Sequence, residues 1–197
     1  IFVTFKTKIV TFCLMAAMIL VIFLPATTKA DTLIPDDVYF TEAQSGTCTL
    51  ASAAMMLRAR MYLSGSSEWA QITDTGIRGT AWAGSGLYYN FTIWTGEDEF
   101  MTVGHNETYG ISAATLKALL DEHPEGIVLH CSSPMHAVHL TDYEGNVFYC
   151  ADPARDFENG AKRINLMDSY IGIHYSSIDG VLGSVCGYWY VREYNIH

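Results

Sequence analysis

The sequence has few basic residues for its length. In 197 residues, 11 Lys and Arg stand against 21 Asp and Glu, which gives a formal net charge of −10. No extended run of Lys or Arg occurs, and neutralising phosphates requires clustered cations, so the chain is a poor candidate for binding nucleic acid. The same shortage of cations disfavours electrostatic adhesion to an anionic membrane.

The sequence also lacks internal repeats, low-complexity tracts and a cell-wall sorting signal. Apolar residues make up 50% of the chain and aromatic residues 13%, which argues against a disordered chain and provides enough material for a buried core. At this length a single domain is the natural expectation.

The first thirty residues differ in character from the rest. Lys6 and Lys8 precede an apolar run of 16 residues over 9–24, and Pro25 then stops any helix. A basic start, an apolar middle and a small-x-small site at Thr28 and Ala30 predict a secretory signal over 1–30. An uncleaved membrane anchor is the alternative, but 16 residues fall short of the roughly 18–20 needed to span a bilayer. We therefore expect a secreted protein whose mature domain covers 31–197.

Cysteine is scarce in the mature domain, which carries only Cys48, Cys131, Cys150 and Cys186. Four cysteines allow two disulfides in any of three pairings, and they are too few to indicate a disulfide scaffold. If one thiol is kept free for catalysis, at least one more is unpaired. Spacing alone does not choose between these possibilities.

The hydrophobic pattern predicts helices first and strands afterwards. Helices are expected over 48–63, over 72–82, and from Ser112 until Pro124 stops the helix. Strands are expected over 87–94, 99–103, 127–131, 136–143, 147–151 and 186–193. This order indicates an α+β domain in which an N-terminal helix packs on an antiparallel sheet.

The first helix is predicted to begin at Cys48, after turn and cap residues at Ser45, Gly46 and Thr47. The start of a helix offers free backbone N–H groups and a partial positive charge, and both favour a thiolate. Since a free thiol is only about 3% ionised at pH 7, a nearby imidazolium is also needed to make a nucleophile. A buried, unreactive cysteine is the structural alternative.

A histidine and an aspartate lie at matching ends of a predicted hairpin. His136 opens the strand 136–143, and Asp152 follows the strand 147–151. Because a short turn places the start of one strand beside the end of its partner, the two side chains are expected to be neighbours. A carboxylate beside an imidazole fixes its tautomer, which is the third role in a Cys-His-Asp site.

Four segments carry a resemblance to a known family. They are SGTCTLASAAMMLRAR, HPEGIVLHC, PMHAVHLTDYEGNVFYCADP and GYWYV. They resemble a secreted, stand-alone bacterial branch of the papain-like cysteine peptidases, similar to the bacteriocin leader (double-glycine) peptidase family. The resemblance implies that Cys48 is the nucleophile, His136 the general base and acid, and Asp152 the orienting acid. It also implies a peptide or protein substrate, with cleavage after small residues such as Gly.

The resemblance departs from the family pattern at one position. The family carries a Gln about six residues before the Cys that donates to the oxyanion, and here that position is Glu42. The nearest glutamine is Gln44, which is therefore the candidate oxyanion donor. The backbone N–H of Cys48 is the candidate for the other donor.

Other interpretations remain open at this point. A metal site built from His130, Cys131, His136 and His139 is disfavoured because residues 136 and 139 face opposite sides of a strand. No cofactor is expected, and we expect a monomer. Peptidoglycan amidase or endopeptidase activity uses the same thiol–imidazole chemistry, and Glu42 favours a third reading, a non-catalytic binding module that keeps the fold.

Overall fold

The structure is a computed structural model in which residues 34–155 and 160–197 are described. The segment predicted to be a secretory signal lies outside the described residues. Within these two ranges, no helix has both the length and the hydrophobicity needed to cross a bilayer.

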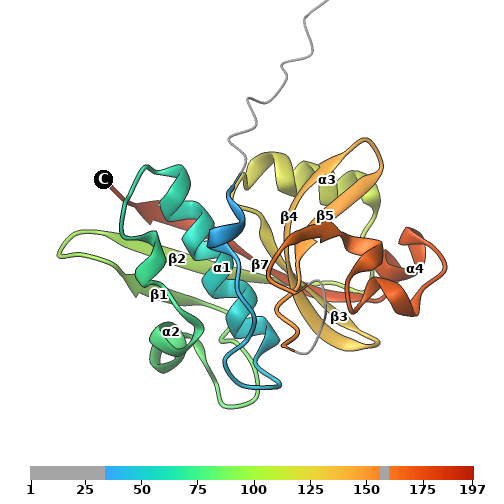
Figure 1. Ribbon diagram of the computed structural model, residues 1–197, viewed down its shortest axis with the longest axis horizontal. Helices are drawn as coiled ribbons and strands as arrows, with labels where there is room; N and C mark the ends of the chain where they lie inside the picture. The colour runs from blue at the N-terminus through green and yellow to red at the C-terminus, as the bar shows by residue number, and fades with distance from the viewer. Residues whose placement is uncertain (1–33, 156–159) are drawn as a thin grey trace, which may run out of the picture. The chain divides into compact units, whose positions relative to one another are not determined.

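The described chain alternates helical and extended elements (Figure 1). The α-helices are α1 (Cys48–Leu63), α2 (Asp74–Ala81), α3 (Ala113–Glu122) and α4 (Ile178–Gly183). Short 3-10 turns are η1 (Asp36–Val38), η2 (Trp69–Gln71), η3 (Leu166–Asp168) and η4 (Gly172–His174). The strands are β1 (Phe91–Trp94), β2 (Phe100–Glu107), β3 (Ile127–Ser132), β4 (Met135–Glu144), β5 (Val147–Ala151), β6 (Arg163–Asn165) and β7 (Val185–Asn195).

The seven strands form one sheet in the order β1-β2-β7-β3-β4-β5-β6, and every neighbouring pair is antiparallel. The last strand, β7, lies in the middle between β2 and β3, so the chain's final segment completes the sheet. In the β4–β5 hairpin, Gly145 takes a φ of +59°, a backbone conformation that tight hairpin turns require. The α+β class with an antiparallel sheet, predicted from the sequence, is confirmed.

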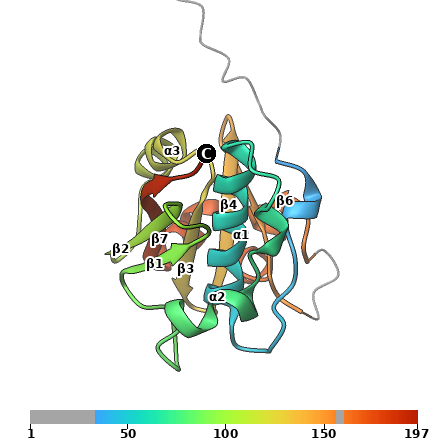
Figure 2. The ribbon, with the colours of Figure 1, turned by 90° about the vertical axis from the view of Figure 1, so that its left-hand side faces the viewer.

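The period-2 alternation of the central strands divides their side chains between two hydrophobic layers. One layer packs against α1 and includes Val128, Ala137 and Trp189. The other packs against α3 and α4 and includes Leu129, Val138 and Tyr188. Figure 2 shows α1 running alongside β4, the contact on which the site described below depends.

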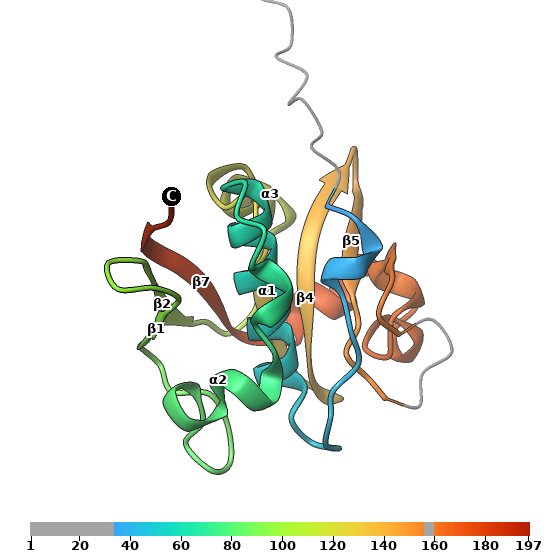
Figure 3. The same cartoon turned by 60° about the vertical axis from the view of Figure 1, so that its left-hand side comes forward.

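Helix α1 is buried on nearly all sides, as expected for a helix dense in Ala, Met and Leu. Leu50, Ala54 and Leu57 contact the sheet layer. Met55 and Ala59 pack instead against Val38 and Tyr39 from the segment before the helix, which passes close to α1 and β5 in Figure 3. The helix is thereby held between the sheet and the N-terminal segment, which fixes the position of its first residue.

Some boundaries differ from those expected. The helix over 48–63 and the strand over 147–151 have the predicted bounds. The strand predicted over 87–94 is shorter, because Leu87 pairs with Trp82 in an isolated bridge and only Phe91–Trp94 pairs with β2. Strand β6 and helix α4 were not predicted, since three and six residues are too few to show a period.

His139 is a buried structural histidine on β4. Its side chain is fully buried, and Nε2–H donates to the Glu125 carbonyl oxygen at 2.8 Å. Nδ1 is buried without a hydrogen-bond partner among the described residues. Burial lowers the pKa of His139 from 6.5 to about 4, so the ring is neutral in the folded protein.

Because of the buried His139, the protein should lose stability in acid. Because the pKa is lower in the folded chain than in the unfolded chain, the stability contribution is present above pH 6.5 and is lost as the pH falls toward about 4. The difference corresponds to roughly 3 kcal/mol. Urea denaturation at pH 7 and pH 4 measures it. In His139→Gln, which keeps an N–H donor but does not titrate, the decrease between the two pH values should be smaller by that amount, and an unchanged decrease would contradict the assignment.

Candidate active site

Cys48 is the first residue of α1 and is half-buried. Thr47 is the N-cap residue, as predicted, but its side chain makes no capping hydrogen bond, and its hydroxyl donates to the Gln44 carbonyl oxygen at 2.6 Å. The first N–H groups of a helix have no partners within it. Among the described residues no acceptor is bonded to the Cys48 N–H, so this donor is available beside the sulfur.

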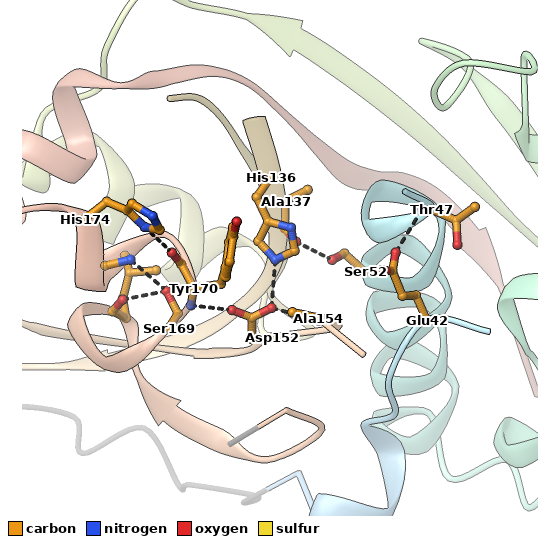
Figure 4. Close-up of polar contacts among 12 residues, drawn as sticks. Glu42, Thr47, Ser52, His136, Ala137, Asp152, Ala154, Ser169, Tyr170 and His174 are labelled. Atoms are coloured by element: carbon orange, nitrogen blue, oxygen red, sulfur yellow. Dashed lines mark hydrogen bonds and ion pairs between the residues drawn. The ribbon is translucent and has the colours of Figure 1, made fainter. Parts of the chain in front are cut away.

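A contact between α1 and β4 positions Cys48 next to a histidine. Ser52 lies one turn after Cys48 on the same helix face, and its hydroxyl donates to the carbonyl oxygen of Ala137 at 3.3 Å (Figure 4). Ala137 directly follows His136, and Cys48 lies close enough to the His136 ring for their interaction to raise the pKa of the imidazole. One contact between α1 and β4 therefore brings Cys48 and His136 together, although they are 88 residues apart in the sequence.

The His136 ring also contacts Asp152. Nε2 of His136 lies 2.7 Å from Oδ1 of Asp152, and both residues are buried, with relative exposures of 7% and 0%. The contact arises as the sequence predicted: β4 and β5 form a hairpin, and the residue near the start of β4 meets the residue that follows β5. Since Nε2 faces Asp152, Nδ1 is the ring nitrogen left for Cys48.

Asp152 is held in place by backbone groups. Oδ1 accepts from the Ala154 N–H at 2.9 Å and Oδ2 accepts from the Tyr170 N–H at 2.7 Å. These bonds orient the carboxylate toward His136 before any substrate is present. Asp152 is thus a buried carboxyl group with both oxygens hydrogen-bonded, and not an exposed turn residue.

The segment after β6 covers the histidine–aspartate pair. The Tyr170 ring packs edge-on against the His136 ring, with centroids 5.2 Å apart, and it packs in the same manner against His174. The Nδ1–H of His174 donates to the Tyr170 carbonyl oxygen at 2.7 Å (Figure 4). Sequence reasoning missed Tyr170, because no local pattern shows that this segment returns to the end of β5.

The electrostatics of His136 favour a charged imidazole. Burial lowers its pKa, but hydrogen bonds and charge interactions with Asp152 and Cys48 more than offset that effect and raise the pKa to about 9. At neutral pH the ring is therefore an imidazolium beside a sulfur at a helix start. A neighbouring imidazolium and a helix start are two features that activate cysteine nucleophiles in enzymes in general.

A second cysteine–histidine pair provides a contrast. Cys186 Sγ lies 3.4 Å from Nδ1 of His130 on the neighbouring strands β7 and β3. Here burial raises the pKa of the thiol and lowers the pKa of the imidazole, so both stay neutral. No carboxylate contacts His130 among the described residues. The two pairs therefore differ in a third group, because Asp152 bonds to His136 and no carboxylate bonds to His130 in the described part of the chain.

The remaining cysteines have a structural character. All four cysteines in the described part of the chain are free thiols. Burial raises the pKa of Cys131 to about 11 and that of Cys150 well above its ordinary value.

Within the described residues no group of three or more His, Cys, Asp or Glu side chains is arranged to hold a metal ion.

The two candidates for the oxyanion site lie in different surroundings. Gln44 is exposed, and its side-chain oxygen accepts a hydrogen bond from Arg78 at 3.2 Å. Glu42 is buried, with 8% exposure, and its Oε2 accepts from the Thr47 N–H at 2.8 Å. The structure therefore brings Glu42, and not Gln44, into the group formed by Cys48, His136 and Asp152.

Comparison with known families agrees with this geometry. A family model described as "Peptidase_C39 like family" matches residues 31–180, which is most of the chain and includes all three candidate residues. The chain belongs to this family. The searches of curated proteins and of solved structures returned no match.

Membership of the Peptidase_C39-like family explains the arrangement of the fold. The family is one of papain-like cysteine peptidases, and the helix bearing Cys48 against an antiparallel sheet is consistent with that architecture. In this Peptidase_C39-like chain the cysteine helix comes first, the histidine strand follows, and the aspartate comes after the next strand.

Proposed function

We propose that this protein is a secreted cysteine peptidase that hydrolyses peptide bonds through Cys48, His136 and Asp152. The observation that carries the proposal is the buried His136–Asp152 contact at 2.7 Å, beside a cysteine at the start of a helix. Family membership supports cysteine peptidase chemistry in general. The raised pKa of His136 supports the assignment of that chemistry to these three residues.

The mechanism follows from the positions of the groups. The Cys48 thiolate attacks the substrate carbonyl carbon, and the electron pair of the C=O π bond moves to the oxygen. When this intermediate collapses, the C–N bond breaks and His136 gives its Nδ1 proton to the leaving amine. His136 then takes a proton from water, whose oxygen attacks the acyl carbon. When this second intermediate collapses, the C–S bond breaks, which releases the acid and restores the Cys48 thiolate. Asp152 holds the ring in one tautomer throughout.

The proposed site of action is outside the cell that makes the protein. The basic and apolar N-terminal segment and the small-x-small site support export with cleavage after Ala30. N-terminal sequencing of the protein recovered from the medium should then begin at Asp31. A chain retained with its N-terminal segment intact would overturn this part of the proposal.

The activity is tested with a defined peptide library at pH 5–8, in which new termini are identified by mass spectrometry. The control is the same protein with Cys48 blocked by iodoacetamide. New termini that depend on free Cys48 support the peptidase. Release of soluble muropeptides from purified cell walls, with no cleavage in the library, would favour wall hydrolysis instead. A protein that cleaves neither material would favour the binding module.

A further inference from the structure

A pocket lies between helix α1, helix α2 and the edge strand β1. Helix α2 contacts both α1 and β1 (Figure 1), and residues of the three elements line a pocket of about 220 Å³. Cys48, His136 and Asp152 do not line it. Met61 in its wall follows Cys48 by 13 residues on α1, which corresponds to roughly 20 Å along the helix axis. The pocket is therefore separate from the proposed site of hydrolysis.

The inner wall of the pocket is apolar. It is made by buried side chains with exposures between 1% and 9%, namely Met61, Ile72, Ile77 and Ile93. Such a wall favours the aliphatic part of a ligand, because binding removes apolar surface from water. The polar and aromatic groups at the rim then determine which ligand fits.

The rim carries an acid and an aromatic ring that are both accessible. Glu68 is exposed, and its carboxylate forms no ion pair and no hydrogen bond among the described residues. The Trp94 side chain is 64% exposed and packs against Phe100, with ring centroids 5.3 Å apart. A carboxylate and an indole ring on one pocket are groups that bind a cation, the first through charge and the second through its π electrons.

A polar atom in the same wall lacks a partner. The Thr95 hydroxyl oxygen is buried and has no hydrogen-bond partner among the described residues. Because buried polar atoms in folded proteins are nearly always hydrogen-bonded, such an atom indicates a missing partner. A ligand in the pocket is one source of that partner, and ammonium and guanidinium groups carry several N–H donors each.

The charges around the pocket also favour a cation. No Lys or Arg in the described part of the chain lines it. The neighbouring Arg58 donates to backbone carbonyl oxygens and stacks on the Phe40 ring, so its charge is already bound. The turn after Thr95 adds the exposed acids Glu97 and Asp98. The pocket therefore attracts a cationic ligand and repels an anionic one.

We propose that this pocket binds the side chain of a lysine or arginine residue in a peptide. The aliphatic stem lies on the isoleucine side chains, and the cationic head lies at the rim with Glu68 and Trp94. The proposal goes beyond hydrolysis, because binding here involves none of the three candidate catalytic residues. For the peptidase, it means that a substrate reaching both sites carries its basic residue at least about six positions from the cleaved bond, since an extended chain covers at most about 3.6 Å per residue.

A peptide too short to reach both sites tests the pocket by itself. The probe is the pentapeptide Ala-Ala-Lys-Ala-Ala with both ends blocked, added to the protein whose Cys48 has been alkylated by iodoacetamide. NMR follows the backbone N–H signals of residues 93–95. The lysine peptide should shift them saturably, and the peptide with norleucine in place of lysine, which keeps the stem without the charge, should bind at least about fivefold more weakly. Raising the salt from about 0.05 M to about 0.5 M should weaken only the lysine peptide.

Two variants and a matched control identify the residues. Glu68→Gln removes the charge at the rim and should raise the Kd of the lysine peptide at least about tenfold. Trp94→Leu should raise it about two- to fivefold. Glu122→Gln removes an equally exposed carboxylate from α3, which packs on the other hydrophobic layer, and should leave the Kd unchanged.

The outcomes separate this proposal from the peptidase. Absence of a saturable shift, or equal Kd values for the lysine and norleucine peptides, would overturn the cation site. Equal Kd values in Glu68→Gln and Glu122→Gln would overturn the assignment of Glu68 as the group that binds the cation. Each of these results leaves hydrolysis untouched, because cleavage of the peptide library by free Cys48 is measured independently.

Discussion

Cys48→Ala is expected to abolish peptide hydrolysis, with kcat falling by at least about 10⁴-fold while the fold is retained. Alanine removes the one sulfur among the described residues that acts on the His136 imidazole, so no acyl-enzyme can form. The substitution takes one atom from a half-buried position at a helix start, and alanine is the best helix former, so the thermal midpoint should change little. Steady-state kinetics and thermal denaturation on the same preparation measure both effects.

Cys186→Ala is the matched control for this experiment. Cys186 is also half-buried and also lies beside a histidine, at 3.4 Å from His130 Nδ1. Because burial keeps both members of that pair neutral, its removal should leave kcat unchanged. Residual hydrolysis by Cys48→Ala within tenfold of the wild type would show that another group is the nucleophile.

The second large effect is expected for Asp152→Ala. This change removes the acceptor for His136 and leaves the N–H groups of Ala154 and Tyr170 without their partner. Burial, which alone would lower the pKa of His136, is then opposed only by Cys48, so the pKa should fall from about 9 toward or below its ordinary value. Loss of an orienting carboxylate costs about 10⁴-fold in kcat in comparable sites.

The pH dependence distinguishes this role from simple loss of structure. In Asp152→Ala the alkylation rate of Cys48 at pH 5 should drop far more than the rate at pH 9, since the thiolate at low pH depends on the imidazolium. Asp152→Asn retains an oxygen for His136 but not the negative charge, and it should also lose about 10⁴-fold in kcat. Equal alkylation profiles in the wild type and both variants would contradict the assignment of Asp152 as the positioning residue.

The two cysteine–histidine pairs explain why site residues are hard to assign from proximity. Cys48–His136 and Cys186–His130 are both sulfur–imidazole contacts on the described fold. They differ in the third group, a buried carboxylate in the first pair and none in the second. An anionic partner that cannot reach water stabilises the imidazolium, and the imidazolium stabilises the thiolate.

The buried His139 limits the stability of the protein on the acidic side. His139 is neutral when buried and becomes increasingly destabilising as the pH falls toward about 4. Since His139 bonds to the Glu125 carbonyl oxygen and not to the candidate site, His139→Gln should change stability in acid without changing the groups of the site.

Much of the site could be predicted from the sequence because its causes are local. The periodic Ala, Met and Leu residues after Cys48 determine a helix with the cysteine at its start. The short turn between two strands brings the start of β4 near the end of β5, and His136 and Asp152 remain neighbours although a bulge between Leu140 and Asp142 shifts the register. The order helices-then-strands determined the α+β class.

The tertiary structure alone decided what surrounds these residues. Tyr170 reaches Asp152 from a segment whose sequence carries no period, and Glu42, not Gln44, is turned inward by its bonds to Thr47 and Pro153. Whether a carboxyl group is neutral or charged, and whether a thiol beside a histidine ionises, depends on burial and on partners distant along the chain. Those quantities arise from packing, so no local pattern in the sequence encodes them.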